Sequence, residues 1–229
     1  MKNKLMGMAL ALALTVGLCP GMAFAAADDL AAARPASTLA TQASVADLAK
    51  KATKAMNALP AASKVKLSDV KKVEAAFNAV SAVMEAPDFE NLTKSKSVAQ
   101  GFVQAYDGKF KPAQVALDKL IKSETSKTKK AKVKGVKVNA GSKKATVSWT
   151  KLGAGYKYEV YYSLKKSSGF KKAASTNSAK LVVNKLAKGK KYYFKVRGFR
   201  VLPMTSLDSS LTDTVYTKYS SVVVSKAIK

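Results

Sequence analysis

Cations and aromatic residues are concentrated in one stretch of fifteen residues, 186–200, which reads LAKGKKYYFKVRGFR. A surface that grips an anionic ligand would use such a mixture, because lysine and arginine attract negative charge. A β-strand with one buried face would use it as well, since its aromatic side chains fill the core while its lysines lie in water. The alternation of residue types within the stretch indicates which side chains serve which purpose.

From residue 192 to residue 198 every second residue is apolar, which favours the strand interpretation. Tyr192, Phe194 and Val196 share one face, and we expect them in a core. Cross-strand aromatic pairs stabilise a sheet by about 0.2–1 kcal/mol each, which by itself accounts for rings on the outward face. A ligand-contacting role for that face is the alternative, and its candidate residues are Tyr161, Tyr193, Lys195, Arg197, Phe199 and Arg200.

Side chains suited to catalysis are scarce. The chain has no histidine, and its single cysteine is Cys19, so the usual general base and the thiol nucleophile are both missing from the rest of the sequence. Most zinc and copper sites are excluded for the same reason. Beyond residue 124 the only carboxylates are Glu159, Asp208 and Asp213, too few and too scattered to indicate an acid–base pair. We therefore predict no enzyme, no cofactor and no metal site.

The carboxy-terminal half follows a period of two. Its short alternating segments are separated by Gly, Ser and Lys turns, which is typical of an antiparallel sandwich. Inward positions include Trp149, Tyr158 and Val160. Seven strands are expected, near residues 133–139, 143–150, 156–163, 169–174, 180–184, 190–200 and 219–225.

Three spaced motifs carry a family resemblance: Trp149, the pattern Tyr158-x-Val160-x-Tyr162, and Leu186-x-x-Gly189-x-x-Tyr192 ahead of Phe194-x-Val196. With these, residues 131–229 resemble a fibronectin type III domain, in a lysine-rich form similar to modules of bacterial secreted proteins. The resemblance implies that Tyr192 forms the tyrosine corner, its hydroxyl bonding to upstream backbone. It also implies that Leu186 packs in the core and that Gly189 makes a turn. One departure is the long connection over 201–218.

The amino-terminal half follows the helical period instead. Two apolar stripes at three- and four-residue spacing cover residues 45–59 and 67–84, and each ends at a proline. Shorter stripes follow, and together they predict a small helical bundle over residues 41–122. Residues 45–85 resemble helical-bundle modules of Gram-positive surface proteins, which serve as spacers or interaction domains. A Ser/Thr/Lys run without apolar periodicity predicts a linker over 123–131, followed by the type III domain at 132–229.

The first residues have the anatomy of a secretory leader: a basic start, an apolar run and a small-residue cleavage site. We expect a signal peptide at 1–26 and a disordered segment at 27–40. Leu18 stands directly before Cys19, where a lipoprotein signal needs a small residue, so lipidation is not expected. The expected location is secreted and extracellular, with association to a cell surface but without a covalent anchor.

Charge divides the two halves sharply. Residues 27–124 hold 14 basic and 11 acidic residues, whereas residues 125–229 hold 25 basic and only 3 acidic ones, a balance of +22. Beyond the leader only Arg34, Arg197 and Arg200 are arginines, so the attraction to anions should be diffuse and sensitive to salt. The alternative is that the lysines only keep sheet edges soluble and unpaired.

These observations predict a multidomain α + β protein, with a helical bundle followed by a seven-strand antiparallel β-sandwich. The expected function is non-catalytic binding or adhesion at a cell surface, with an anionic cell-wall polymer, a glycan or a surface protein as partner. Non-specific binding of other polyanions is compatible with the charge. The alternative is a structural spacer or accessory protein whose interactions reside in the helical half.

Overall fold

The computed structural model describes residues 43–229. The expected signal peptide at 1–26 and the expected disordered segment at 27–40 lie outside these residues. The described chain forms two compact units, of which the helical unit comprises 43–118 with 206–209, and the sandwich unit comprises 119–205 with 210–229.

The helical unit is built from amphipathic helices joined by short 3₁₀ turns. In α2, Val45, Ala49, Ala52 and Met56 are buried at helical spacing, and the Ser44 hydroxyl caps the helix by accepting from the Asp47 N–H at 3.2 Å. The α-helices of residues 43–229 are α2 (Val45–Asn57), α3 (Val70–Met84), α4 (Lys96–Ala105) and α5 (Lys111–Lys130). The short turns are η1 (Ala62–Lys64), η2 (Leu67–Asp69), η3 (Phe89–Lys94) and the π-helical η4 (Tyr106–Phe110).

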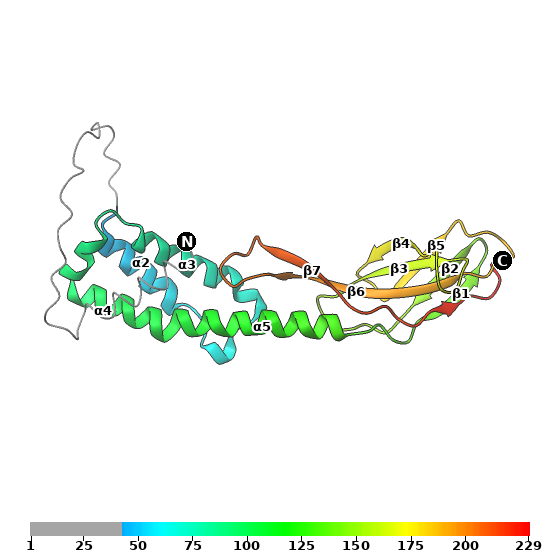
Figure 1. Cartoon of the computed structure of the whole chain (residues 1–229), viewed down its shortest axis with the longest axis horizontal. Helices are drawn as coiled ribbons and strands as arrows, with labels where there is room; N and C mark the ends of the chain where they lie inside the picture. The colour runs from blue at the N-terminus through cyan, green and yellow to red at the C-terminus, as the bar shows by residue number, and fades with distance from the viewer. Residues whose placement is uncertain (1–42) are drawn as a thin grey trace, which may run out of the picture. The chain divides into compact units, whose positions relative to one another are not determined.

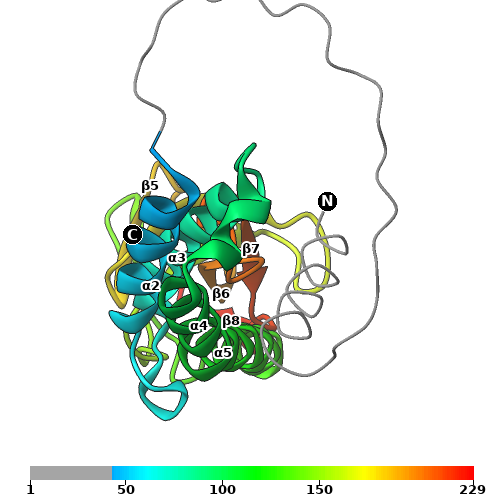
Figure 2. The same cartoon turned by 90° about the vertical axis from the view of Figure 1, so that its left-hand side faces the viewer.

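Helix α2 packs against both α3 and α4, and the three lie side by side (Figures 1 and 2). Many of the contacts between them are made by alanine, including Ala49, Ala76 and Ala99, which are fully buried. Larger buried side chains fill the remaining space: Met56, Val73, Val83, Leu92, Phe102 and Phe110. Alanine removes little apolar area from water, so the core of this unit is thin for its length.

The expected linker at 123–131 is helical as far as Lys130, because α5 continues through it. The boundary between the two units falls inside α5, after Asp118. Within the sandwich unit, Glu124 accepts from Arg200 at 2.7 Å, and the buried Thr128 hydroxyl lies 3.3 Å from the Tyr156 hydroxyl. The polar composition of this segment predicted a linker, but its tertiary contacts stabilise a helix, so packing outweighs local propensity here.

The sandwich unit has two antiparallel sheets, with three strands in the order β1-β2-β5 and five in the second, ordered β4-β3-β6-β7 with β8 also paired to β6. Two antiparallel sheets with a shared core between them form a β-sandwich. The strands are β1 (Lys137–Gly141), β2 (Lys144–Ser148), β3 (Lys157–Ser163), β4 (Lys171–Thr176), β5 (Lys180–Asn184), β6 (Tyr193–Pro203), β7 (Thr212–Tyr216) and β8 (Val223–Val224).

The described residues contain eight strands rather than the expected seven. The additional strand lies in the connection at 201–218, which sequence reasoning took for a loop. Here β6 continues to Pro203 and pairs with β7, so that the connection is a β-hairpin (Figure 1).

The core between the sheets is aromatic and β-branched. Phe194, Val196 and Val160 are fully buried, and the Trp149 and Tyr158 rings lie with centroids 5.3 Å apart. The Tyr192 hydroxyl accepts from the backbone N–H of Ala187 at 3.0 Å, five residues upstream, as in a tyrosine corner. Leu186 is buried beside it in the same core.

Gly189 makes the turn ahead of Tyr192. Its φ is +78°, a left-handed conformation that glycine adopts without steric cost. Its N–H donates to the Ile228 carbonyl at 2.8 Å, which ties the turn to the end of the chain that the structure describes.

Candidate binding surface

The outward face of β3 and β6 brings together most of the residues that the alternation selected. Glu159 lies directly opposite Arg197, and Tyr161 lies opposite Lys195. Opposed pairs of this kind have their Cβ atoms about 4.5–5.5 Å apart, close enough for long side chains to interact. The register therefore places two cations beside one carboxylate and one phenol.

Glu159 is the centre of this face, although it lies on the side of the sheet away from the core. It is only 5% exposed, because neighbouring side chains cover it. One carboxylate oxygen accepts from Lys172 at 2.6 Å, and the other accepts from Arg197 at 2.8 Å and from the Tyr161 hydroxyl at 2.9 Å. The buried charge thus has three donors, which is the condition under which a buried carboxylate is tolerated.

Aromatic rings hold the two cations from the sides. The Arg197 guanidinium lies 3.8 Å from the Tyr216 ring centroid, and it also donates to the Tyr161 hydroxyl at 3.1 Å. The Lys195 ammonium lies 4.1 Å from the Tyr219 ring centroid and 4.3 Å from that of Phe170. These are cation–π distances. We call Glu159, Tyr161, Phe170, Lys172, Lys195, Arg197, Tyr216 and Tyr219 the Glu159 cluster.

The pKa values in the cluster follow from these contacts. Burial alone would raise the pKa of Glu159, but the hydrogen bonds from Lys172, Arg197 and Tyr161 outweigh it, and the net pKa is below the ordinary value. Burial and the hydrogen bond to Glu159 both raise the pKa of the Tyr161 hydroxyl. Burial alone would lower the pKa of Arg197, but the hydrogen bond to Glu159 outweighs burial, and the net pKa is raised. Glu159 is therefore a fixed anion and is poorly suited to general acid catalysis.

Two of the six predicted face residues stand apart from this cluster, and Phe199 touches it only through the Tyr216 ring, at 5.8 Å between centroids. Arg200 lies on the opposite side of β6, since neighbouring strand residues alternate, and it binds Glu124 there. Grouping Arg200 with Arg197 and Phe199 was wrong for that reason. Tyr193 shares the outward face with Lys195 and is half-buried, but among residues 43–229 it makes none of the ring contacts that join the others.

Of the eight residues in the Glu159 cluster, only Tyr161, Lys195 and Arg197 were among the predicted face residues. Tyr216, Tyr219, Phe170 and Lys172 lie on β7, in the segment after it, and at β4. Tyr216 and Tyr219 belong to the connection and the final segment, whose register the alternation could not fix. A carboxylate among outward aromatics was the available signal, because Glu159 is the only acidic residue on the described strands other than Asp213.

Most of the polar groups of this surface already bind one another. Within residues 43–229 no group of three or more potential ligand side chains could hold a metal ion. The same residues contain no helix long and apolar enough to cross a bilayer. The cluster offers partly exposed rings and one exposed ammonium, that of Lys172, whose side chain is 47% exposed.

Comparisons with known proteins give fibronectin type III domains of low similarity. A scan against protein-family models found no match, and a search of curated proteins also found none. Among solved structures, an Fn3-like protein from Clostridium thermocellum is 21% identical, with a TM-score of 0.32, over 42% of this chain and 92% of that one.

A fibronectin type III domain of the human fibronectin type III domain containing protein 3 is 19% identical, over 44% of this chain and 86% of that one, with a TM-score of 0.32. A β-1,2-glucanase from Parabacteroides distasonis, at 16% identity and the same TM-score, matches over 44% of this chain but only 13% of its own. The strand order and pairing of residues 137–224 define the sandwich independently of these comparisons.

Proposed function

We propose that this protein is a secreted, non-catalytic binding protein of the cell surface, and that its sandwich unit is attracted to anionic cell-wall polymers or glycans. The observation that carries the proposal is the balance of 25 basic to 3 acidic residues over 125–229. A field of this strength raises the local concentration of polyanions and speeds their association.

Lysine is the residue that supplies the available charge. Every lysine in 125–229 is exposed except Lys195, which is partly covered. In contrast, both arginines of the described residues are bound to carboxylates, Arg197 to Glu159 and Arg200 to Glu124. Flexible, hydrated ammonium groups give diffuse attraction, whereas guanidinium groups give shaped, bidentate recognition. Binding of this kind selects for charge density rather than for one structure.

The few carboxylates of this region do little to offset the lysines. Glu159 is buried beneath Lys172 and Arg197, Asp213 is exposed, and Asp208 is half-buried. Exposed charge on residues 125–229 is therefore predominantly positive. Lysines that protect sheet edges are needed only on edge strands. Four exposed lysines lie in loops and are not explained in this way: Lys165, Lys166, Lys188 and Lys190.

The experiment is capture of the full chain on isolated Gram-positive cell walls, before and after extraction of teichoic acid, at low and at high salt. We expect capture at low salt that falls steeply at high salt and after extraction. Salt-independent capture would contradict an electrostatic mechanism, and absence of capture under all four conditions would favour a spacer.

A matched pair of variants locates the binding charge. Four exposed loop lysines of the sandwich unit are changed to glutamine in one variant: Lys165, Lys166, Lys188 and Lys190. The control changes four exposed lysines of the helical unit, Lys51, Lys54, Lys64 and Lys71, and so removes equal charge. The proposal requires the first variant to be released at lower salt than the control. The reverse order would assign the interaction to the helical unit.

A further inference from the structure

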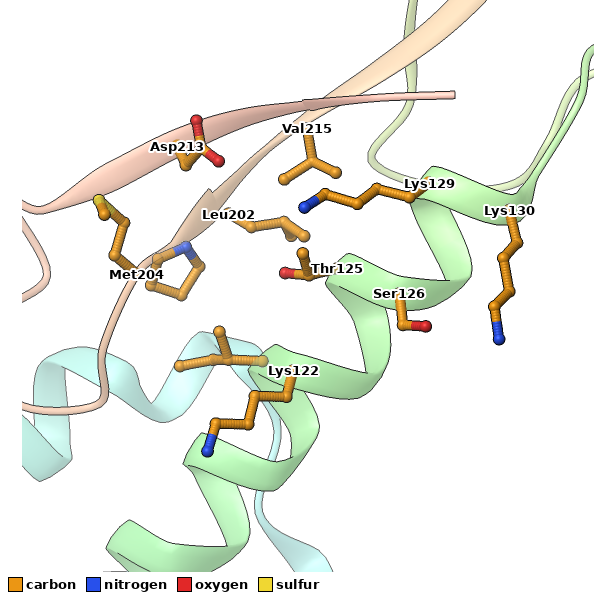
Figure 3. Close-up of a pocket in the computed structure, with 11 residues that line it drawn as sticks. Lys122, Thr125, Ser126, Lys129, Lys130, Leu202, Met204, Asp213 and Val215 are labelled. Atoms are coloured by element: carbon orange, nitrogen blue, oxygen red, sulfur yellow. The ribbon is translucent and has the colours of Figure 1, made fainter. Parts of the chain in front are cut away.

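A groove of about 600 Å³ lies between the last turns of α5 and the β6–β7 hairpin, entirely within the sandwich unit (Figure 3). Its volume falls in the range of about 300–1,000 Å³ that is usual for ligand sites. The Glu159 cluster does not line it. The groove is therefore a second, separate surface, and its composition differs from that of the cluster.

The floor of the groove is apolar. Ile121 from α5, Leu202 from β6 and Val215 from β7 line it, and each is at most 5% exposed. Pro203 and Met204 extend the apolar lining, and Met204 is 64% exposed. An exposed methionine beside a buried apolar floor provides adaptable contact area for an apolar side chain of a partner.

The rim on the helix side is cationic. Lys122, Lys129 and Lys130 are exposed and line the groove, with Thr125 and Ser126 between them (Figure 3). None of the three lysines forms an ion pair with any residue between 43 and 229. Over eight residues of α-helix they span about 12 Å, the length of about four residues of extended peptide.

The helix dipole accounts for only part of this rim. Cations near a helix C-terminus stabilise it, which is sufficient reason for Lys129 and Lys130 at the end of α5. Lys122 lies about two turns earlier, beyond the reach of that effect. A polyanion of phosphate or sulfate groups would need the lysines but not the apolar floor. An acidic segment of protein would use both.

We propose that this groove binds an acidic peptide segment of a partner protein, which places apolar side chains on Ile121, Leu202 and Val215 and carboxylates against Lys122, Lys129 and Lys130. Asp213 on β7 stands across from this rim and repels the carboxylates, so it directs them toward α5 (Figure 3). This site goes beyond the attraction of anionic polymers, because it selects for apolar side chains as well as for charge.

The test measures binding of dye-labelled peptides to the full chain by fluorescence anisotropy. The first peptide is capped Gly-Glu-Glu-Leu-Leu-Glu-Glu-Gly, the second has serine in place of both leucines, and the third has lysine in place of every glutamate. We expect the first to bind about tenfold more tightly than the second, a difference of about 1.4 kcal/mol, since one of two adjacent leucines in an extended peptide faces the apolar floor. The third should not bind.

Charge variants test the rim. Lys122→Glu with Lys129→Glu should weaken binding of the first peptide about tenfold. The matched control, Lys119→Glu with Lys134→Glu, reverses the same charge at exposed positions that do not line the groove, and should change it about twofold or less. Equal loss in both variants would overturn the proposal in favour of diffuse attraction, as would equal binding of the leucine and serine peptides.

Two single substitutions test the floor and the repelling carboxylate. Met204→Gln should weaken binding of the first peptide several-fold. Leu164→Gln should leave that binding unchanged, because Leu164 is 57% exposed and lies outside the groove. Asp213→Asn should strengthen binding of the first peptide about twofold, because it removes the repelling carboxylate. Cell-wall capture is measured on the same variants, so failure of the groove and failure of the polymer interaction give separate results.

Discussion

Two surfaces of the sandwich unit combine cations with apolar side chains, and they differ in whether the cations have anionic partners. In the Glu159 cluster, Arg197 and Lys172 share a buried carboxylate and Lys195 lies between two rings. In the groove beside α5, Lys122, Lys129 and Lys130 have no ion-pair partner within the described chain. The comparison indicates that clustered cations make a binding surface only where they have no anionic partner within the protein.

The physical reason is the cost of desolvation. Arg197 and Glu159 have already lost most of their water, and a ligand anion would have to displace a carboxylate that fits well. The groove lysines remain hydrated and flexible, so an anion can pair with them without breaking an existing contact. We therefore assign stability to the cluster and recognition to the groove and the exposed lysines.

The largest effect should follow removal of the buried charge in the cluster. Glu159→Gln leaves Arg197 and Lys172 without their anion, and we expect a loss of about 3 kcal/mol in the free energy of unfolding of the sandwich unit. Urea unfolding followed by the fluorescence of Trp149, the chain's single tryptophan, reports this unit alone. The control Asp213→Asn removes an exposed carboxylate and should cost about 0.5 kcal/mol or less. Equal losses would mean that the cluster is not a stabilising unit.

A smaller effect is expected from acid. The folded-state pKa of Glu159 is lowered by donors that outweigh burial, and that of Glu124 by hydrogen bonds from Lys127 and Arg200. Each therefore stabilises the fold above its unfolded pKa of about 4.3, and that contribution is lost as pH falls through the lower folded value. Unfolding by urea at stepwise pH from 6 downward should show stability falling below about pH 4.5. Glu159→Gln should flatten this dependence, and an unchanged profile would contradict the assignment.

Arginine and lysine should differ at position 197 in stability but not in binding. Arg197→Lys keeps the charge yet loses the planar stacking on Tyr216 and the donors to both Glu159 and Tyr161. We expect a loss of about 1 kcal/mol and no change in the salt concentration that elutes the protein from immobilised polyphosphate. Earlier elution would mean that Arg197 contacts the polymer directly, as the original face hypothesis required.

The smallest effect on stability is expected in the groove. Met204→Gln alters a side chain that is 64% exposed, so the free energy of unfolding should change by about 0.5 kcal/mol or less, while peptide binding weakens. The same urea titration measures it. A loss above about 1 kcal/mol would show that Met204 belongs to the packed core, and the groove floor would then need to be redrawn.

Alternation predicted the inward residues well, because burial follows a period of two wherever a sheet has one packed face. Tyr158, Phe194 and Val196 are buried as expected. The outward cluster could not be derived, since Glu159 meets Tyr216 and Tyr219 only through strand pairings that no local pattern encodes. The groove was hidden for a different reason: Thr125–Lys130 has the composition of a linker, and its helix is stabilised by contacts with residues about 30 to 75 positions away.

The most direct test of the account is the affinity of the full chain for polyphosphate, measured across a range of salt concentrations. Polyphosphate carries dense negative charge and no apolar side chain, so it reports the exposed lysines alone. We predict that the logarithm of the association constant falls linearly and steeply with the logarithm of the salt concentration, as counterions are released from the polymer. An affinity that hardly changes with salt would contradict the claim that unpaired lysines on the sandwich unit give this protein its attraction to anionic polymers.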